Sequence, residues 1–117
     1  MKVNSLYVAA KDFERAKICY TETIFQKSPD IETDRFVFFD LNGFLFGIFN
    51  PTITGEEITY GNNAVPTIEV DDVDAQYKRL TDAGLKSIMP PQDVNGTRIA
   101  QIEDTEGNTL EFYQWNK

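Results

Sequence analysis

The sequence predicts an α+β fold made of two βαβββ modules, whose paired curved mixed sheets enclose a cleft with helices on the outer faces. Two observations predict it. The same order of strand, helix and hairpin patterns occurs twice along the chain. Superposing Asp12 on Asp72, and then Asp40 on Asp104, changes the offset between the copies by only a few residues. We therefore expect residues 1–117 to form a single domain with an internal duplication.

The first module is expected at about residues 1–50. Alternating apolar residues up to Ala10 predict a strand, and Asp12 is a candidate N-cap for a helix at about 13–26. Apolar spacing in this helix places Cys19 inside as a small hydrophobe. Two further apolar runs, Arg35–Asp40 and Phe44–Phe49, are separated by a short connection typical of a hairpin.

The second module is expected at about residues 64–117, after a linker at about 51–63. Its predicted elements follow the same order: a strand, an N-cap, a helix that stops at a glycine, and two strands joined by a turn at 104–108. They are Val65–Val70, Asp72, Val73–Ala83, Gly84, Thr97–Glu103 and Thr109–Trp115. Asp71, Asp72 and Asp74 lack the spacing of a calcium loop, so they indicate helix capping.

Composition excludes several classes of function. The 117 residues carry a net charge of −8, which disfavours nucleic acid and anionic membranes as partners and tolerates a cationic ligand. Cys19 is the only cysteine and there is no histidine, so neither an intrachain disulfide nor a cysteine–histidine dyad can form. No signal-peptide core or membrane-length apolar run is present, and a cytoplasmic protein is expected.

Period-two alternation assigns the faces of the strands. In the last strand, Leu110 and Phe112 are expected to face the helix, so that the remaining residues face the cleft. The same argument applied to the other strands completes a candidate ligand-binding set that is rich in aromatic and acidic side chains. The set consists of Ser5, Tyr7, Phe49, Thr67, Glu69, Glu111, Tyr113 and Trp115.

Three segments together resemble the glyoxalase/bleomycin-resistance/extradiol-dioxygenase superfamily, also called the vicinal oxygen chelate fold. They are Val8–Tyr20, Ile68–Ala75 and Asp104–Phe112, and the resemblance covers nearly the whole chain. Metal-dependent members hold an ion with histidines on first strands and a carboxylate on the last strand. Residue by residue, the resemblance places Ser5 or Asn4, Gly47 and Val65 at ligand positions, and only Glu111 keeps a ligand. No metal and no other cofactor is therefore expected.

Glu111 has three interpretations. It could accept hydrogen bonds from hydroxyls such as Ser5 or Thr67 or be solvated, it could anchor a cationic or hydrogen-bond-donating ligand together with Glu69 and the aromatic rings, or it could act as a general base. The resemblance favours a small-molecule-binding protein without a catalytic metal that sequesters a cationic or aromatic compound. The alternatives are a lyase, isomerase or dioxygenase of the same superfamily, and a regulatory or interaction module with a vestigial cleft. The resemblance also implies a homodimer, with clefts that could form across subunits.

Overall fold

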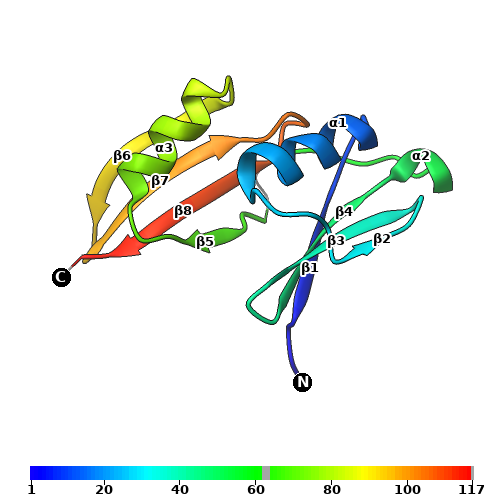
Figure 1. Cartoon of the computed structure of the whole chain (residues 1–117), viewed down its shortest axis with the longest axis horizontal. Helices are drawn as coiled ribbons and strands as arrows, with labels where there is room; N and C mark the ends of the chain where they lie inside the picture. Colours follow the sequence, from blue (N-terminus) through cyan, green and yellow to red (C-terminus); the bar gives the residue numbers. More distant parts are fainter. Residues whose placement is uncertain (62–63, 117) are drawn as a thin grey trace. The chain divides into compact units, whose positions relative to one another are not determined.

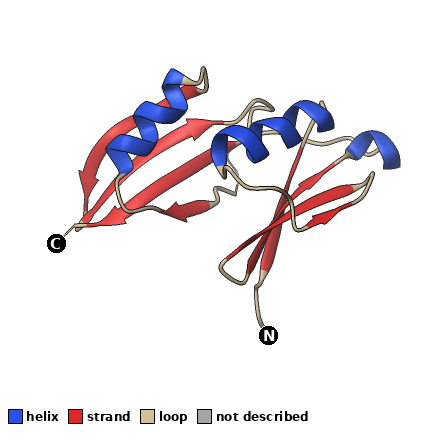
Figure 2. Ribbon diagram, in the orientation of Figure 1, coloured by secondary structure: helices blue, strands red, loops and turns tan. Residues whose placement is uncertain are grey.

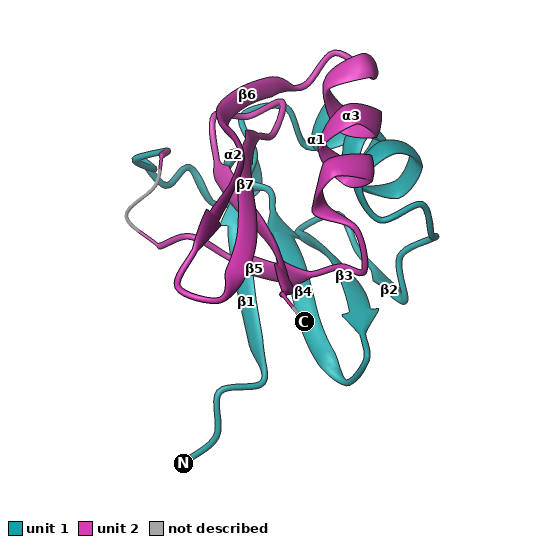
Figure 3. Cartoon of the chain, turned by 90° about the vertical axis from the view of Figure 1, so that its left-hand side faces the viewer, with its two compact units in different colours: residues 1–60 teal, residues 61–117 magenta. Residues whose placement is uncertain are grey.

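The computed structural model describes residues 1–61 and 64–116. The chain divides into two compact units, unit 1 (Met1–Tyr60) and unit 2 (Gly61–Lys117), which are coloured separately in Figure 3. Each contains one four-stranded mixed sheet. The two sheets and the repeated element order confirm the predicted α+β class with duplicated βαβββ modules. The cleft expected between the modules stays a prediction.

Unit 1 contains a sheet in the order β1-β4-β3-β2, in which β1 and β4 run parallel and the other pairs are antiparallel (Figure 1). The two-residue connection between β3 and β4 places Asn42 and Gly43 at φ angles of 57° and 92°, as a primed hairpin turn requires. The elements are β1 (Ser5–Ala9), α1 (Phe13–Ile18), η1 (Cys19–Ile24), β2 (Ile31–Glu32), β3 (Phe36–Leu41), β4 (Phe44–Phe49) and α2 (Pro51–Thr54). The short helix α2 lies in the segment expected to be a linker.

The first helix differs from the single helix expected at 13–26. It begins as an α-helix under the Asp12 cap, which accepts from the backbone N–H of Arg15, and continues as the π-helix η1. The wider turn is visible in the hydrogen bond from Phe25 N to Tyr20 O, five residues back, at 2.9 Å. Tyr20 and Ile24 are both buried on the side of this helix that packs against the sheet.

The core of unit 1 lies between this helix and one face of the sheet. Val37 and Phe39 from β3 are fully buried, and the ring of Tyr20 lies 5.3 Å from that of Phe46 on β4. Cys19 is buried, as predicted for a small hydrophobe. The helix therefore occupies one face, and the even-numbered residues of β3 are left for the opposite face.

Unit 2 has the sheet order β5-β8-β7-β6, with β5 parallel to β8 and α3 across one face (Figure 2). The strand predicted at 65–70 is shorter in the structure because Pro66 has no N–H to add to the ladder, although its carbonyl accepts from Glu111 N at 2.9 Å. The elements are β5 (Thr67–Glu69), α3 (Val73–Asp82), β6 (Lys86–Val94), β7 (Thr97–Glu103) and β8 (Thr109–Trp115).

Strand β6 has no strand signature of its own in the sequence, because Pro90 and Pro91 interrupt it. The sheet accepts both prolines because β6 is an edge strand and its pairing with β7 is irregular between Met89 and Gln92. An edge strand leaves half of its N–H groups unpaired, so a proline there removes no ladder bond that the sheet needs. The duplicated order is thus complete in unit 2.

Acidic residues at the start of α3 have structural roles. Asp72 caps the helix by accepting from Ala75 N at 3.0 Å, as predicted. Asp74 accepts from Arg98 on β7 at 2.6 and 2.9 Å, and Arg98 also donates to Asp93 on β6 at 3.3 Å. This connection ties the helix to the β6–β7 hairpin, and Arg98 lowers the pKa of the Asp74 carboxyl below its ordinary value.

Candidate functional site

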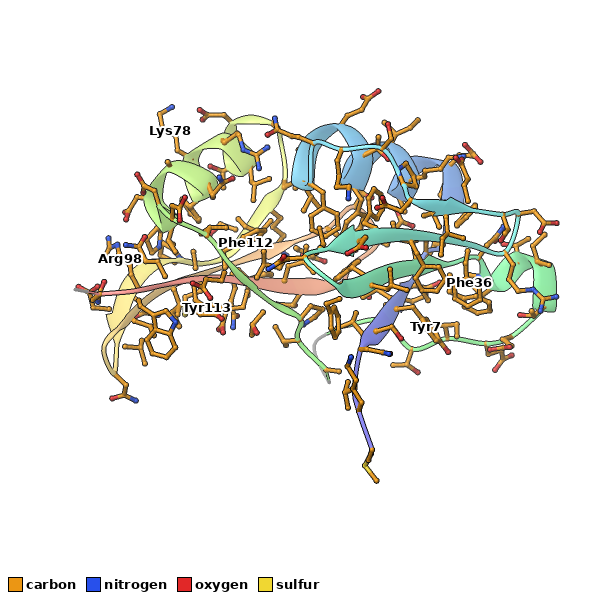
Figure 4. All side chains as sticks on the ribbon, turned by 60° about the horizontal axis from the view of Figure 1, so that its bottom comes forward. Tyr7, Phe36, Lys78, Arg98, Phe112 and Tyr113 are labelled. Carbon is orange, nitrogen blue, oxygen red and sulfur yellow. The ribbon has the colours of Figure 1, made fainter. Side chains whose placement is uncertain are left out.

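Strand β8 separates a packed face from an open one. Leu110 and Phe112 are buried on the helix side, as the alternation predicts. Figure 4 labels Phe112 and Tyr113, sequence neighbours whose side chains point to opposite sides of the strand. The predicted phase of this strand is therefore correct, and Glu111, Tyr113 and Trp115 share the face without the helix.

The turn before β8 fixes where this face begins. The Asp104 carboxylate is buried and accepts hydrogen bonds from the backbone N–H groups of Glu106 and Asn108, both at 2.8 Å. Its second oxygen accepts from Asn108 Nδ2 at 3.0 Å. A buried carboxylate that satisfies two backbone donors holds the turn in one geometry and so fixes the pairing of β7 with β8.

The open face of unit 2 contains a depression of about 230 Å³. Two hydroxyls, one carboxylate and three apolar or aromatic side chains line it: Thr67, Thr97, Ile99, Glu111, Tyr113 and Trp115. Four of these belong to the set that the sequence singles out. Pockets for drug-sized ligands usually measure about 300–1,000 Å³, so this depression is smaller than such pockets.

Glu111 has a hydrogen-bond partner that the sequence does not point to. Gln101 on β7 lies directly opposite Glu111 in the antiparallel register, and its Nε2 donates to Glu111 Oε1 at 3.1 Å. The expected hydroxyl partners were Ser5 or Thr67. Thr67 is the parallel register partner of Glu111 on β5, yet the hydrogen bond comes from the amide. The partner of Glu111 is thus its neighbour on β7 and not its neighbour on β5.

Aromatic rings stand at the other end of the depression. Tyr113 and Trp115 contact each other edge to face, with ring centroids 6.1 Å apart, and Trp115 is 64% exposed. The Tyr113 hydroxyl donates to Glu69 at 3.3 Å. Burial raises the pKa of Tyr113 above its ordinary value, and the nearby charge of Glu69 adds to the shift. At neutral pH the phenol is therefore protonated and is a hydrogen-bond donor.

Unit 1 has an aromatic face at the corresponding position. Tyr7 lies 5.4 Å from the ring of Phe36 and 5.5 Å from that of Phe49. Ser5 is exposed two residues earlier on the same strand. The structure brings Tyr7 and Phe49 into contact with each other; the prediction that they and Ser5 join Glu111 in one ligand site stays a prediction.

In unit 1, the space that corresponds to the Glu111 side chain is filled by the ring of Phe38. Gly47 lies opposite Phe38, as Glu111 lies opposite Gln101. A Cβ added at Gly47 would lie 2.5 Å from Phe38 Cε1, so the ring occupies the space that a carboxylate at Gly47 would need.

The residues present do not fit the metal that the fold family implies. Of the four ligand positions, Gly47 and Val65 offer no side-chain donor, Ser5 or Asn4 offers a hydroxyl or an amide, and the one carboxylate is engaged with Gln101. Nor do any three His, Cys, Asp or Glu side chains gather as a possible metal site within residues 1–61 and 64–116. Catalytic transition metals need several nitrogen, sulfur or carboxylate ligands, and this donor set supplies too few.

Three residues at or beside this site were not predicted from the sequence: Thr97, Ile99 and Gln101. All three lie on β7, whose inward face was left unassigned. Counting outward from the turn at 104–108 pairs Glu103 with Thr109 and hence Gln101 with Glu111. The hairpin register was thus a signal that could have found them.

The protein thus has a duplicated α+β fold of two modules. A candidate small-molecule site lies in the small depression, with a carboxylate at one end and rings at the other. The family described as Glyoxalase/Bleomycin resistance protein/Dioxygenase superfamily matches residues 2–112, and the chain belongs to this superfamily. No curated protein sequence matches it significantly.

Solved structures show the same fold. A glyoxalase-related enzyme from Fulvimarina pelagi superposes with a TM-score of 0.80 at 19% identity, covering 97% of this chain and 87% of that one. A glyoxalase/bleomycin resistance protein from Albidiferax ferrireducens T118 gives 0.79 at 21% identity, with 95% and 96% covered. Lactoylglutathione lyase from Agrobacterium tumefaciens gives 0.76 at 19% identity, with 97% and 92% covered. Such identities indicate a shared fold and leave the activity open.

The helices are short. Within the described residues, none is long and apolar enough to cross a membrane.

Proposed function

We propose that this chain binds a small cationic compound with an aromatic or similarly flat apolar group, in the depression on the open face of unit 2, and that it does so without a catalytic metal. The observation that carries the proposal is the pairing of Glu111 with the rings of Tyr113 and Trp115 around one small volume. A carboxylate attracts the charge, and the rings attract both a cation and a flat apolar group.

The electrostatics support a cation. Among the described residues that line the depression, Glu111 is the only charged one, so no lysine or arginine neutralises it there. Glu69 adds a second negative charge next to Tyr113. The net charge of −8 favours the approach of a cation over that of an anion at low ionic strength.

The superfamily also contains lyases, isomerases and dioxygenases, and several neighbours in structure are described as enzymes. No observation favours that alternative here, because the ligand positions supply one carboxylate and no imidazole nitrogen. A regulatory module with a vestigial cleft is the remaining alternative; it predicts that no small cation binds.

We further propose a homodimer and a cytoplasmic location. The dimer is proposed because the superfamily resemblance implies it, and light scattering during gel filtration would measure the mass in solution.

The cytoplasmic location is proposed because the single buried cysteine is compatible with a reducing compartment.

Replacing Glu111 with glutamine is expected to weaken the binding of benzylamine about tenfold or more. The substitution keeps the size of the side chain and removes its charge, and a hydrogen bond between charged groups contributes about 1.5–3 kcal/mol. Trp115 is the only tryptophan and lines the depression, so its fluorescence reports directly on the site. Titration of wild type and variant with benzylamine gives both dissociation constants.

Asp82→Asn is the matched control. Asp82 is exposed at the end of α3, on the helix side of the sheet, and removing its charge breaks only the surface pair with Lys78. We expect this variant to bind as wild type does. Equal loss in both variants would assign the effect to net charge, and unchanged binding by Glu111→Gln would remove Glu111 from the site.

Metal analysis tests the metal-free part of the proposal. Protein purified without chelators is expected to contain far less than one zinc, iron, nickel or manganese ion per chain by mass spectrometry, because the four ligand positions supply one carboxylate. A stoichiometric ion that disappears in Glu111→Ala would show that Glu111 is a metal ligand and would overturn the metal-free part of the proposal.

A further inference from the structure

We propose that Gln101 is a positioning residue for Glu111 and that it makes the depression selective for cations that carry N–H groups, such as primary ammonium or amidinium, over quaternary ammonium. This inference rests on the proposed function and specifies its ligand class. It starts from the hydrogen bond between Gln101 Nε2 and Glu111 Oε1, which joins β7 to β8 beside the depression.

The hydrogen bond determines how the amide is oriented. An ionised carboxylate accepts hydrogen bonds and donates none, so the nitrogen of Gln101 must face it. The amide oxygen is then turned away from Glu111 Oε1 and keeps its acceptor capacity. Glu111 Oε2 is a second acceptor, and none of the described residues donates to it or to the Gln101 oxygen.

Thr67 adds a third acceptor nearby. It lies opposite Glu111 on the other side of β8, lines the depression, and its hydroxyl has no hydrogen-bond partner among the described residues. Glu111 is thus flanked by Gln101 on β7 and by Thr67 on β5. These groups offer three acceptors, and their only donors beyond the Gln101–Glu111 bond are the Thr67 hydroxyl and the second N–H of Gln101 Nε2.

A site rich in hydrogen-bond acceptors discriminates between cations that carry N–H groups and cations that carry none. A primary ammonium group has three N–H donors, and an amidinium has four in one plane, so either can satisfy several acceptors at once. A quaternary ammonium group carries the same charge and no donor. Its binding would remove water from acceptors that are then left without a partner, which is unfavourable.

The contrast with unit 1 supports a specific role for this pair. At the same two register positions unit 1 has Phe38 and Gly47, which offer no polar side-chain atom. The polar pair is therefore not a requirement of the hairpin, because the same fold forms around a ring and a glycine. Holding Glu111 in one rotamer also reduces the entropy that a ligand must otherwise remove on binding.

The test compares two probes of equal charge, benzylamine and benzyltrimethylammonium, by Trp115 fluorescence and by the side-chain amide signal of Gln101 in a proton–nitrogen NMR spectrum. The proteins are wild type, Gln101→Met, which keeps the length of the side chain without its amide, and Gln101→Asn, whose shorter amide cannot reach Glu111. Thermal unfolding of each variant verifies that it folds.

Wild type is expected to bind benzylamine at least about fivefold more tightly than benzyltrimethylammonium, since charged hydrogen bonds strengthen binding by at least this factor. Benzylamine should also shift the Gln101 amide signal. In both variants the ratio of the two affinities should fall to about twofold or less through weaker benzylamine binding. Because the extra bulk of the trimethyl group is the same in every protein, a purely steric preference would leave the ratio unchanged.

A ratio near one in wild type, or an unchanged ratio in both variants, would overturn the role of Gln101 while leaving cation binding intact. If neither probe affects Trp115 or the unfolding temperature of wild type, the proposed function fails and this inference fails with it. The two failures are therefore distinguishable in one set of titrations.

Discussion

Replacing Gly47 with glutamate is expected to lower the free energy of unfolding by about 3 kcal/mol or more. The new Cβ would lie 2.5 Å from Phe38 Cε1, so the ring must move. That ring stacks on Phe36 at 5.2 Å, which limits where it can go. Overpacking costs about 1–3 kcal/mol, and a carboxylate placed against rings without a donor adds a desolvation cost of similar size. Chemical denaturation with urea measures the loss.

A second substitution should restore part of this stability. Phe38→Gln in the Gly47→Glu background would recreate in unit 1 the pair that Gln101 and Glu111 form in unit 2, because the two pairs hold equivalent register positions. We expect the double variant to recover about 1.5 kcal/mol relative to Gly47→Glu, as a favourable coupling between neighbours. Phe38→Leu in the same background is the control, since it makes room without supplying a donor. If the free energy of unfolding of Gly47→Glu lies within about 0.5 kcal/mol of the wild-type value, the Phe38 ring does not fill the space beside Gly47.

Replacing Asp104 with alanine is expected to destabilise the protein by about 2–4 kcal/mol. The carboxylate is buried and accepts from the backbone N–H groups of Glu106 and Asn108, which would both lose their partner. Each unsatisfied buried donor costs about 1–3 kcal/mol, and water that enters the turn recovers part of that cost. Thermal and urea unfolding give the value.

Asp104→Asn separates the acceptor from the charge. The asparagine keeps one carbonyl oxygen for the two backbone donors and loses the second acceptor for Asn108 Nδ2, so a smaller loss of about 1–2 kcal/mol is expected. Because this turn fixes the pairing of β7 with β8, Asp104→Ala should also weaken benzylamine binding through Trp115 and Glu111. Equal stability of the alanine and asparagine variants would mean that the backbone donors do not depend on this side chain.

The two units show how one fold carries two different faces. At matching positions of the sheet, unit 1 presents Tyr7, Phe36 and Phe38, and unit 2 presents Thr67, Ile99 and Gln101. The helix-facing side of each sheet carries a buried apolar core, such as Phe39 and Phe46 in unit 1 and Ala100 and Phe112 in unit 2, as packing of a helix on a sheet requires. Divergence is thus concentrated on the face that packing against the helix does not constrain, which is where a ligand site can change without loss of the core.

The sequence by itself determined the elements whose signals are local. Alternation set the phase of β8 and hence the face of Glu111, Tyr113 and Trp115, since a strand shows its two faces at every second residue. Asp12 and Asp72 marked the helix starts because a capping oxygen acts within three residues. The duplicated order then predicted the fold class and, through the three motif segments, the family.

Only the tertiary structure decided the features that depend on neighbours distant in the chain. Strand β6 forms despite Pro90 and Pro91 because it lies at an edge, and an edge position is a property of the sheet and not of the segment. The π turn at Cys19–Ile24 carries Tyr20, whose ring packs against Phe39 and Phe46 from distant strands. The partner of Glu111 and the ring that fills the space at Gly47 both depend on side-chain rotamers across a strand pair, which neither periodicity nor composition encodes.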